Sequence, residues 1–268
     1  MTVSANATMW PLAPMTAPEG DVVVVLPVYR NAATLPELAQ RLTRSLAPTG
    51  LDYRLLFVVD ASPDDAWRVV QELAAQDTRI AGLLLATNQG QHCALLAGMA
   101  QVRARWVAVM DADLQDPPEL LPELIAACER SDLTVFARRR GAYQSSGRML
   151  TSRLFKSLLG WLLRMPTDVG TYLVIPRRVC DRLCAAAIRH PQVVVMARAF
   201  SPGWRGVPFV RERRAQGSSA YTAAARVRAA VRSLRCAWEC RQALTTGARP
   251  EPSNADLRPA VVAARVNI

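Results

Sequence analysis

Two hydrophobic periodicities alternate along the first half of the chain. Continuous apolar runs predict strands buried on both faces, at residues 21–28, 53–59, 80–86 and 106–110. Apolar residues at three- and four-residue spacing predict the helices between them, at residues 34–46, 62–76 and 92–102. Strands and helices that alternate in this way form a parallel sheet wrapped by helices. We therefore expect an α/β fold with a mostly parallel sheet flanked by helices.

The second half is less regular. A helix is expected at residues 121–129, and short strands are expected at residues 133–137, 171–175 and 207–210. Two basic amphipathic helices are expected at Arg148–Arg164 and Thr222–Gln242, the second with Val227, Val231, Leu234 and Trp238 at helical spacing.

The two ends of the chain differ from this pattern. Residues 1–20 contain several prolines and no basic start, which indicates a flexible leader rather than a signal peptide. Residues 243–268 have little periodicity, so we expect a disordered tail. One domain at residues 21–242 would remain. A run of 18 or more apolar residues, as in a membrane-spanning helix, is absent from the sequence.

Polar clusters follow three of the predicted strands. They are Tyr29-Arg30-Asn31, Asp60-Ala61-Ser62 and Asp111-Ala112-Asp113. Ligands of parallel α/β sheets bind beyond the carboxyl ends of the strands. The three clusters therefore predict a binding site at one edge of the sheet.

Each candidate residue in this site has a structural alternative. The Asp-x-Asp carboxylates suit Mg²⁺ or Mn²⁺ with substrate phosphates, or they cap a turn before Pro117-Pro118. Asp60 could bind a nucleobase or ribose, or close an Asx turn. His92 could act as a general base, although its position favours a residue that starts a helix.

Charge and cysteine content add two expectations. The net charge of +11 suggests a polyanionic partner, such as nucleic acid, an anionic membrane surface or a phosphorylated substrate. Arg211-Glu212-Arg213-Arg214, followed by small residues, could clamp phosphate or form a solvated charge run. Six cysteines without a secretory leader indicate a reducing, cytoplasmic location, and their four-residue spacing in two pairs favours buried thiols over zinc.

Five segments together resemble the polyprenyl-phosphate branch of family 2 glycosyltransferases, which have a GT-A (Rossmann-like) fold. This branch includes dolichol-phosphate mannose synthase and undecaprenyl-phosphate aminoarabinose transferase. The most specific segment is M-D-A-D-L-Q-D-P-P-E at residues 110–119. The others lie at residues 26–31, 57–64, 88–99 and 214–221, the last against R-x-x-G-x-S-K-Y.

The resemblance implies roles for the matching positions. The nucleotide sugar would be bound by Pro27, Tyr29, Asp60, Asp111, Asp113 and Ser219. A divalent metal, Mn²⁺ or Mg²⁺, would be held by Asp111, Asp113 and Gln115. The implied catalytic residues are Asp113, Asp168 and Arg214.

The implied reaction is an inverting, metal-dependent transfer of a hexose-type sugar from a nucleotide-sugar donor to a polyprenyl phosphate. A phosphate acceptor needs no strong general base, whereas a soluble hydroxyl acceptor would need Asp168 as the base. A degenerate, non-catalytic sugar-nucleotide-binding protein is the third alternative, because Val59 and Ala220 replace a usual acid and a usual lysine.

The resemblance also bears on where the protein is located. Members of this branch often carry membrane helices, so here the two amphipathic segments could instead lie on the inner face of the cell membrane. Packing of both segments on the sheet is the equal alternative. No nucleic-acid recognition motif occurs, so nucleic acid is not expected as a partner.

Overall fold

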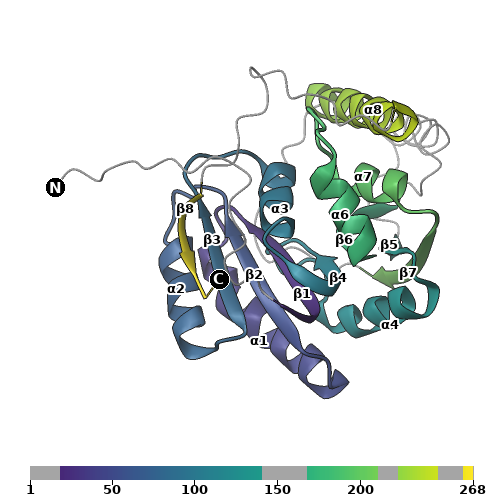
Figure 1. Cartoon of the computed structure of the whole chain (residues 1–268). Coiled ribbons are helices and arrows are strands. Elements are labelled where there is room, and N and C mark those ends of the chain that lie inside the picture. Colours follow the sequence, from purple (N-terminus) through teal and green to yellow (C-terminus); the bar gives the residue numbers. More distant parts are fainter. Residues whose placement is uncertain (1–18, 141–167, 211–222, 247–261, 268) are drawn as a thin grey trace.

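An eight-stranded sheet forms the centre of the protein (Figure 1). The structure is a computed structural model that describes residues 19–140, 168–210, 223–246 and 262–267. The strands are β1 (Glu19–Val28), β2 (Tyr53–Val59), β3 (Ile80–Leu85), β4 (Arg103–Val109), β5 (Thr134–Arg140), β6 (Val169–Pro176), β7 (Trp204–Val210) and β8 (Val262–Val266). Their order across the sheet is β7-β5-β6-β4-β1-β2-β3-β8.

Most strands of the sheet run in one direction. β4, β1, β2 and β3 pair in parallel, as do β5 and β7. β6 is antiparallel to both β4 and β5, and β8 is antiparallel to β3. Only these two of the described strands therefore oppose the others, and the expected mostly parallel α/β sheet is confirmed.

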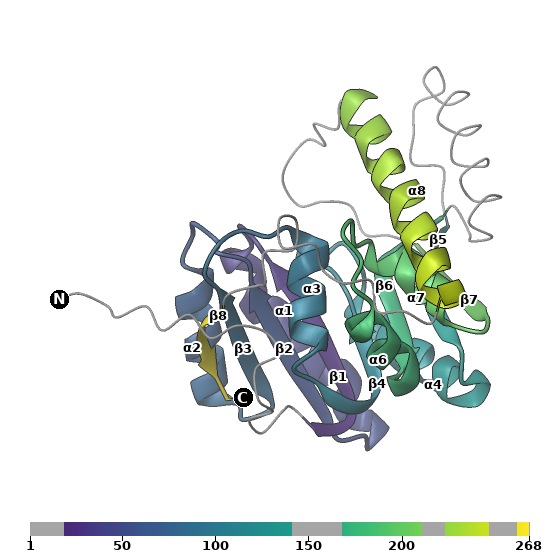
Figure 2. The same ribbon diagram turned by 45° about the horizontal axis from the view of Figure 1, so that its top comes forward.

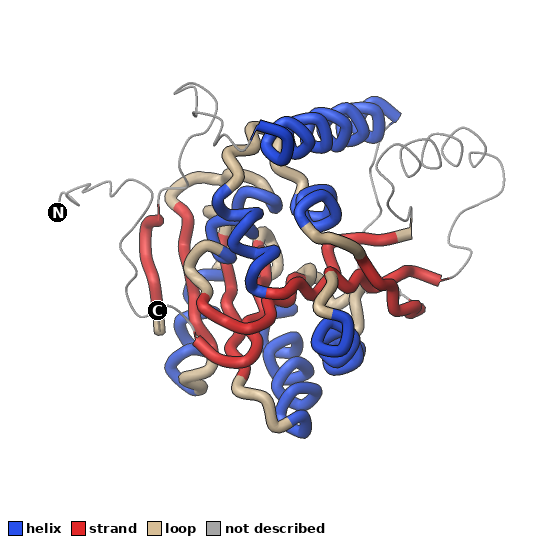
Figure 3. The backbone as a smooth tube through the Cα atoms, turned by 45° about the vertical axis from the view of Figure 1, so that its right-hand side comes forward, coloured by secondary structure: helices blue, strands red, loops and turns tan. Residues whose placement is uncertain are grey.

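Helices cover both faces of the sheet (Figures 1 and 3). One layer contains α1 (Leu35–Leu46), α2 (Ala66–Gln76) and α4 (Leu121–Ser131), and the other contains α3 (Gln91–Met99), α6 (Arg177–Ala185), α7 (Val193–Phe200) and α8 (Ala223–Thr246). Three short 3₁₀ turns lie at Ala32–Thr34 (η1), Ala47–Thr49 (η2) and Pro118–Leu120 (η3).

β1 shows why the central strands are apolar on both sides. Its alternate residues Val22 and Val24 pack on the α1 side, whereas Val23 and Val25 pack on the α3 side. All four are fully buried. A strand covered on both faces cannot alternate with polar residues, which explains the unbroken apolar run.

Two helices were not predicted from the sequence. α6 has only nine residues and presents three buried ones, Val179, Cys180 and Leu183. α7 begins with Val193-Val194-Val195, a run that favours a strand by local preference. Tertiary packing overrides that preference, because α7 buries its apolar residues against the sheet and α8.

The prediction of a disordered tail at residues 243–268 is wrong for two parts. α8 continues to Thr246, and residues 262–266 form β8 on the edge of β3. The side-chain amide of Asn267 then donates hydrogen bonds to the carbonyls of Ala74 and Ile80 (2.8 and 2.9 Å). These pairings are long-range, so no local periodicity signals them. The predicted leader lies outside the described residues up to residue 18, and β1 begins at Glu19.

None of the helices in the described ranges combines the length and the apolarity needed to cross a bilayer. The predicted amphipathic helix Arg148–Arg164 falls outside those ranges. The other predicted amphipathic helix corresponds to α8, which lies along the edge of the molecule in two views (Figures 1 and 2).

Candidate functional site

Three loops meet at the carboxyl edge of the parallel strands. Val28 at the end of β1 pairs with Val59 at the end of β2, and β4 ends one strand away on the other side. Each following loop contains one non-glycine residue with positive φ: Arg30 (60°), Ala61 (46°) and Leu114 (60°). Such conformations are costly and concentrate at functional sites. Their grouping at one edge marks the predicted site.

The loops after β1 and β2 are joined by hydrogen bonds. The Arg30 N–H donates to Ser62 Oγ (2.7 Å), and the Ala32 N–H donates to Asp64 Oδ2 (2.9 Å). Ser62 Oγ in turn donates to Asp64 Oδ1 (2.5 Å). Burial opposes ionisation of Asp64, but these hydrogen bonds outweigh it and lower the pKa of the carboxyl below its ordinary value. Asp64 therefore fixes both loops as an anion.

Asp60 holds the loop after β3. Its carboxylate is buried and accepts hydrogen bonds from the N–H groups of Gln89 (2.7 Å) and Gly90 (2.8 Å). Gly90 has φ of 85°, a left-handed conformation that glycine adopts without strain. Each oxygen of Asp60 thus has a partner within the protein, which matches the structural alternative for this residue. A contact between Asp60 and the nucleotide stays a prediction.

Asp111 is clamped by two side chains from different elements. Its Oδ1 accepts hydrogen bonds from Thr171 Oγ1 and Gln91 Nε2, both at 2.5 Å. Gln91 begins α3, and Thr171 lies in the antiparallel strand β6. The clamp orients the carboxylate where β4 ends. Sequence reasoning did not identify Gln91 or Thr171 as site residues.

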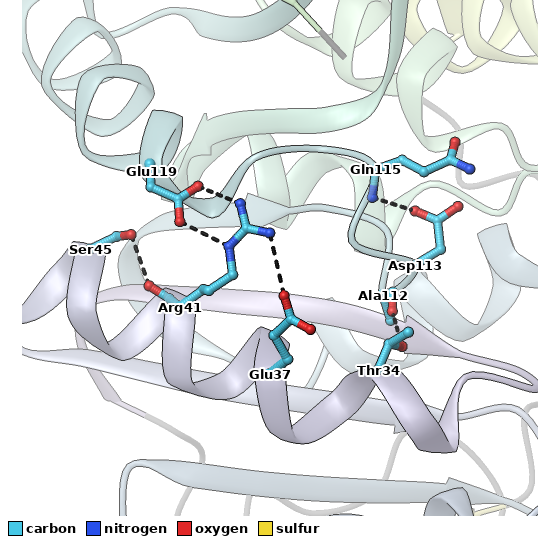
Figure 4. Close-up of polar contacts among 8 residues, drawn as sticks. All are labelled: Thr34, Glu37, Arg41, Ser45, Ala112, Asp113, Gln115 and Glu119. Atoms are coloured by element: carbon cyan, nitrogen blue, oxygen red, sulfur yellow. Dashed lines mark hydrogen bonds and ion pairs between the residues drawn. The ribbon is translucent and has the colours of Figure 1, made fainter. Parts of the chain in front are cut away.

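The segment that contains Asp113 is fixed from below by Thr34, the residue that precedes α1 (Figure 4). The Thr34 hydroxyl donates to the carbonyl of Ala112 (2.7 Å). Thr34 is the N-cap residue of α1 but makes no side-chain cap hydrogen bond to its own helix, so its hydroxyl is free to make this tertiary contact. The Gln115 N–H donates to Asp113 Oδ1 (3.1 Å), and the two side chains extend to the same side of the loop in Figure 4. Gln115 is largely buried.

An ion pair anchors the far end of the same loop. Arg41 of α1 donates two hydrogen bonds to the carboxylate of Glu119, at 2.9 and 2.8 Å, and also lies 3.8 Å from Glu37 (Figure 4). The hydrogen bonds from Arg41 lower the pKa of Glu119. The Tyr172 hydroxyl donates to the carbonyl of Pro117 (3.0 Å), so β6 supports the loop from the other side.

Asp168 directly precedes β6 and forms an ion pair. Arg138 Nε donates to both oxygens of its carboxylate (3.1 and 3.0 Å), and Arg138 Nη2 lies 3.0 Å from Oδ2. The Arg139 N–H also donates to the Asp168 carbonyl (2.9 Å). The predicted acceptor-side acid is therefore held by a neighbouring arginine.

The remaining predicted residues divide into three groups. Pro27 is buried in β1, whereas Tyr29 is exposed and the Arg30 guanidinium lies 5.4 Å from its ring centroid. Arg214 and Ser219 lie outside the described residues. Their roles stay predictions.

His92 fits the helix-start interpretation, and a role as general base stays a prediction. It is the second residue of α3, and its Nδ1 accepts a hydrogen bond from the Val193 N–H (3.3 Å). Burial lowers the pKa of His92 to about 4, and the positive charge of Arg232 adds to the effect. His92 is therefore neutral near pH 7 and bonded within the structure.

The six cysteines are free thiols, of which Cys128, Cys180, Cys236 and Cys240 are buried and Cys93 and Cys184 are half-buried. Within the described ranges, no group of three or more His, Cys, Asp or Glu residues is arranged to hold a metal ion. A divalent metal held by Asp111, Asp113 and Gln115 stays a prediction.

Comparison with known families agrees with this geometry. Residues 23–217 match the family described as Glycosyl transferase family 2. The chain belongs to this family. The match runs from Val23 within β1 past the end of β7 and includes the three strand-end loops.

Curated relatives extend the likeness. The chain is 32% identical over 203 residues to undecaprenyl-phosphate 4-deoxy-4-formamido-L-arabinose transferase of Shewanella sediminis, covering 75% of this chain and 61% of that protein. It is 31% identical over 208 residues to the protein of the same name from Klebsiella pneumoniae, covering 76% and 64%. The chain thus spans less than two thirds of the length of these relatives.

Solved structures share the GT-A fold. Mannosyl-3-phosphoglycerate synthase from Rubrobacter xylanophilus superimposes with a TM-score of 0.60 at 19% identity, over 87% of this chain and 78% of that one. Glucosyl-3-phosphoglycerate synthase from Mycobacterium tuberculosis, solved with Mn²⁺ and UDP, gives 0.56 at 17% identity over 81% and 80%. At these identities the likeness establishes the fold alone.

Proposed function

We propose that this protein transfers a sugar, with inversion, from a nucleotide-sugar donor to a polyprenyl phosphate. Membership of Glycosyl transferase family 2 supports the class of reaction. The observation that carries the acceptor is the identity of 31–32% to proteins named undecaprenyl-phosphate 4-deoxy-4-formamido-L-arabinose transferase. Inversion is the outcome of a single displacement by an oxygen of the acceptor phosphate.

The site at the strand ends supports the donor half of this proposal. Asp111 is oriented by Gln91 and Thr171, and Asp113 lies two residues further along a loop anchored by α1. Ordered carboxylates at the carboxyl edge of a parallel sheet suit the phosphates of a nucleotide when a cation lies between them.

The donor set fits a divalent cation that is shared with the substrate. Mg²⁺ and Mn²⁺ prefer carboxylate oxygens and commonly bind through one or two carboxylates together with substrate phosphates. Asp111 and Asp113 would supply the carboxylates, and Gln115 lies beside Asp113. The bound cation would supply positive charge to stabilise the departing diphosphate.

The ion pair of Asp168 favours a phosphate acceptor over a hydroxyl acceptor. A hydroxyl must lose its proton during attack and needs a base, and Asp168 was the leading candidate. Here both carboxylate oxygens already accept hydrogen bonds from Arg138, so they are engaged within the protein rather than free to contact an acceptor hydroxyl. A phosphate oxygen is already ionised and needs no such group. Asp168 and Arg138 then serve to position the acceptor side.

A lipid-extraction assay tests this proposal. The full chain would be incubated with UDP-, GDP- and dTDP-sugars, Mn²⁺ and undecaprenyl phosphate in detergent micelles. We expect labelled sugar in the organic phase with at least one donor, and its loss in Asp113→Asn. Asp181→Asn, an exposed carboxylate on α6, is the matched control and should retain activity. Transfer only to water-soluble hydroxyl acceptors would contradict the proposal.

A further inference from the structure

Helix α8 has two different apolar faces. The small side chains of Cys236 and Cys240 form the buried face, which packs in the same core cluster as α7. The larger apolar residues Val231 and Leu234 are 41% and 36% exposed. Trp238, on the same side, is 62% exposed. The stripe that the sequence pattern identifies is therefore not the one that packs on the protein.

The exposed residues form a continuous outward stripe. Val231, Leu234 and Trp238 are spaced i, i+3 and i+7, so they share one side of the helix. At about 100° per residue, this side is turned roughly 150° from the side that carries Cys240. Trp238 is the most exposed large apolar side chain of the helix in the described part of the chain. Exposed apolar groups of this kind, bordered by polar residues, mark contact surfaces.

Arginines border the stripe. Arg228 and Arg235 lie on one side, with Arg232 beyond them, and Arg241 lies on the other; all four are exposed. Glu239 is the one acid between residues 228 and 245, and its carboxylate is bonded to His190 Nδ1 (2.8 Å) and the His190 N–H (3.2 Å). Among the described residues, no acidic side chain pairs with these arginines. The outward face of α8 is thus apolar at its centre, and the charged residues at its borders are all arginines.

We infer that the outward face of α8, defined by Val231, Leu234 and Trp238 with their bordering arginines, docks on an anionic lipid bilayer. An amphipathic helix with arginines beside a tryptophan–leucine stripe lies at the boundary of headgroups and acyl chains. Trp is suited to that boundary, and arginines bind anionic headgroups.

Charge complementarity favours this partner over a second copy of the chain. Two α8 faces placed against each other would bring arginines close to arginines, with no exposed acid on the face to compensate. A bilayer supplies negative charge and an apolar interior at once. The inference deepens the proposed function, because a lipid acceptor must be reached at a membrane. The test measures membrane binding and not sugar transfer, so failure of the membrane inference can be distinguished from failure of the proposed function.

Vesicle flotation of the full chain tests this inference. We expect the protein to float with vesicles of phosphatidylcholine containing 30 mol% phosphatidylglycerol, and to remain at the bottom with phosphatidylcholine alone. Raising the salt concentration should weaken binding, because ions screen the arginines. Arg235→Glu and Trp238→Glu should each reduce the partition coefficient by about tenfold or more. Leu234→Ser provides a milder second variant if Trp238→Glu folds poorly, which circular dichroism would reveal.

Two matched control variants distinguish an effect of this face from a general effect of the protein's net charge or hydrophobicity. Leu244→Glu places the same charge on the same helix about 120° away from Trp238, at a side chain that is 53% exposed. Arg44→Glu reverses an exposed charge on α1, which lies at the opposite end of the molecule (Figure 1). Both should float within about twofold of the wild type. Three results would overturn the inference: no flotation with anionic vesicles, equal losses in the controls, or a concentration-dependent dimer that Trp238→Glu abolishes.

Discussion

The clamp on Asp111 offers a sharp test of how the donor site works. Thr171→Val keeps the shape of the side chain and removes the hydroxyl that donates to Asp111 Oδ1 at 2.5 Å. A hydrogen bond to a charged group contributes about 1.5–3 kcal/mol. Gln91 still donates to the same oxygen, so we expect the lower end, about 1.5 kcal/mol. Since 1.4 kcal/mol is a factor of ten, kcat/KM should fall about tenfold.

The assay needs variants that separate positioning from stability. Release of the nucleoside diphosphate would be measured with the donor found active in the extraction assay, alongside urea unfolding. Thr171→Ser keeps the hydroxyl and should recover most of the activity. Thr134→Val makes the same change at a fully buried threonine of β5, whose hydroxyl donates to the Ala197 carbonyl (3.3 Å). It should cost about 1 kcal/mol of unfolding free energy and leave kcat/KM unchanged.

Two outcomes would refute this reasoning. Unchanged kcat/KM in Thr171→Val, together with a lower unfolding free energy, would make the clamp purely structural. Equal activity losses in Thr171→Val and Thr171→Ser would show that the hydroxyl is not what matters. Either result would remove Thr171 from the site.

Three further changes test other contacts. Asp60→Asn places an amide donor against a backbone N–H and should lower the unfolding free energy by about 1.5–3 kcal/mol in urea, whereas an unchanged value would contradict the hydrogen-bond assignment. His92 has a pKa of about 4 in the folded protein and about 6.5 in the unfolded chain, so the unfolded chain binds more protons between these two pH values. The free energy of unfolding should therefore decrease as the pH is lowered from 6.5 to 4, by up to about 3 kcal/mol. His92→Gln should lose less stability than the wild type between pH 7 and 4.5, and an equal loss would refute this. Asn267→Ala removes two hydrogen bonds and should lower the unfolding free energy by about 1–2 kcal/mol, and no change would indicate that β8 adds little.

The central strands could be predicted because burial on both faces leaves an unbroken apolar signal. β2 was predicted with its observed bounds, Tyr53–Val59. β4 was predicted to begin at residue 106 but begins at Arg103. Its first residues alternate between exposed arginines, Arg103 and Arg105, and buried residues, so the apolar run in the sequence begins later than the strand. β8 gave no signal, since its pairing with β3 joins residues far apart in sequence.

In the site, too, residues marked by local sequence could be predicted, whereas contacts between distant segments could not. Asp111 and Asp113 could be located because they directly follow a buried strand. The clamp could not, since Thr171 reaches Asp111 only through the antiparallel pairing of β6 with β4, across 60 residues of sequence. In α8 the pattern identified the apolar stripe correctly, but whether that stripe faces the protein depends on tertiary packing. Cys236 and Cys240, on the other side of the helix, are the residues that pack in the core with α7.

Calorimetric titration of nucleoside diphosphates tests the central claim most directly. UDP, GDP and dTDP would each be titrated into the full chain with and without Mn²⁺, and into Asp113→Asn. The account predicts that at least one of them binds, that binding requires the metal, and that Asp113→Asn weakens it at least about tenfold while Asp181→Asn does not. Absence of binding by all three, or equal affinity in Asp113→Asn, would contradict a donor site built on Asp111-Ala112-Asp113.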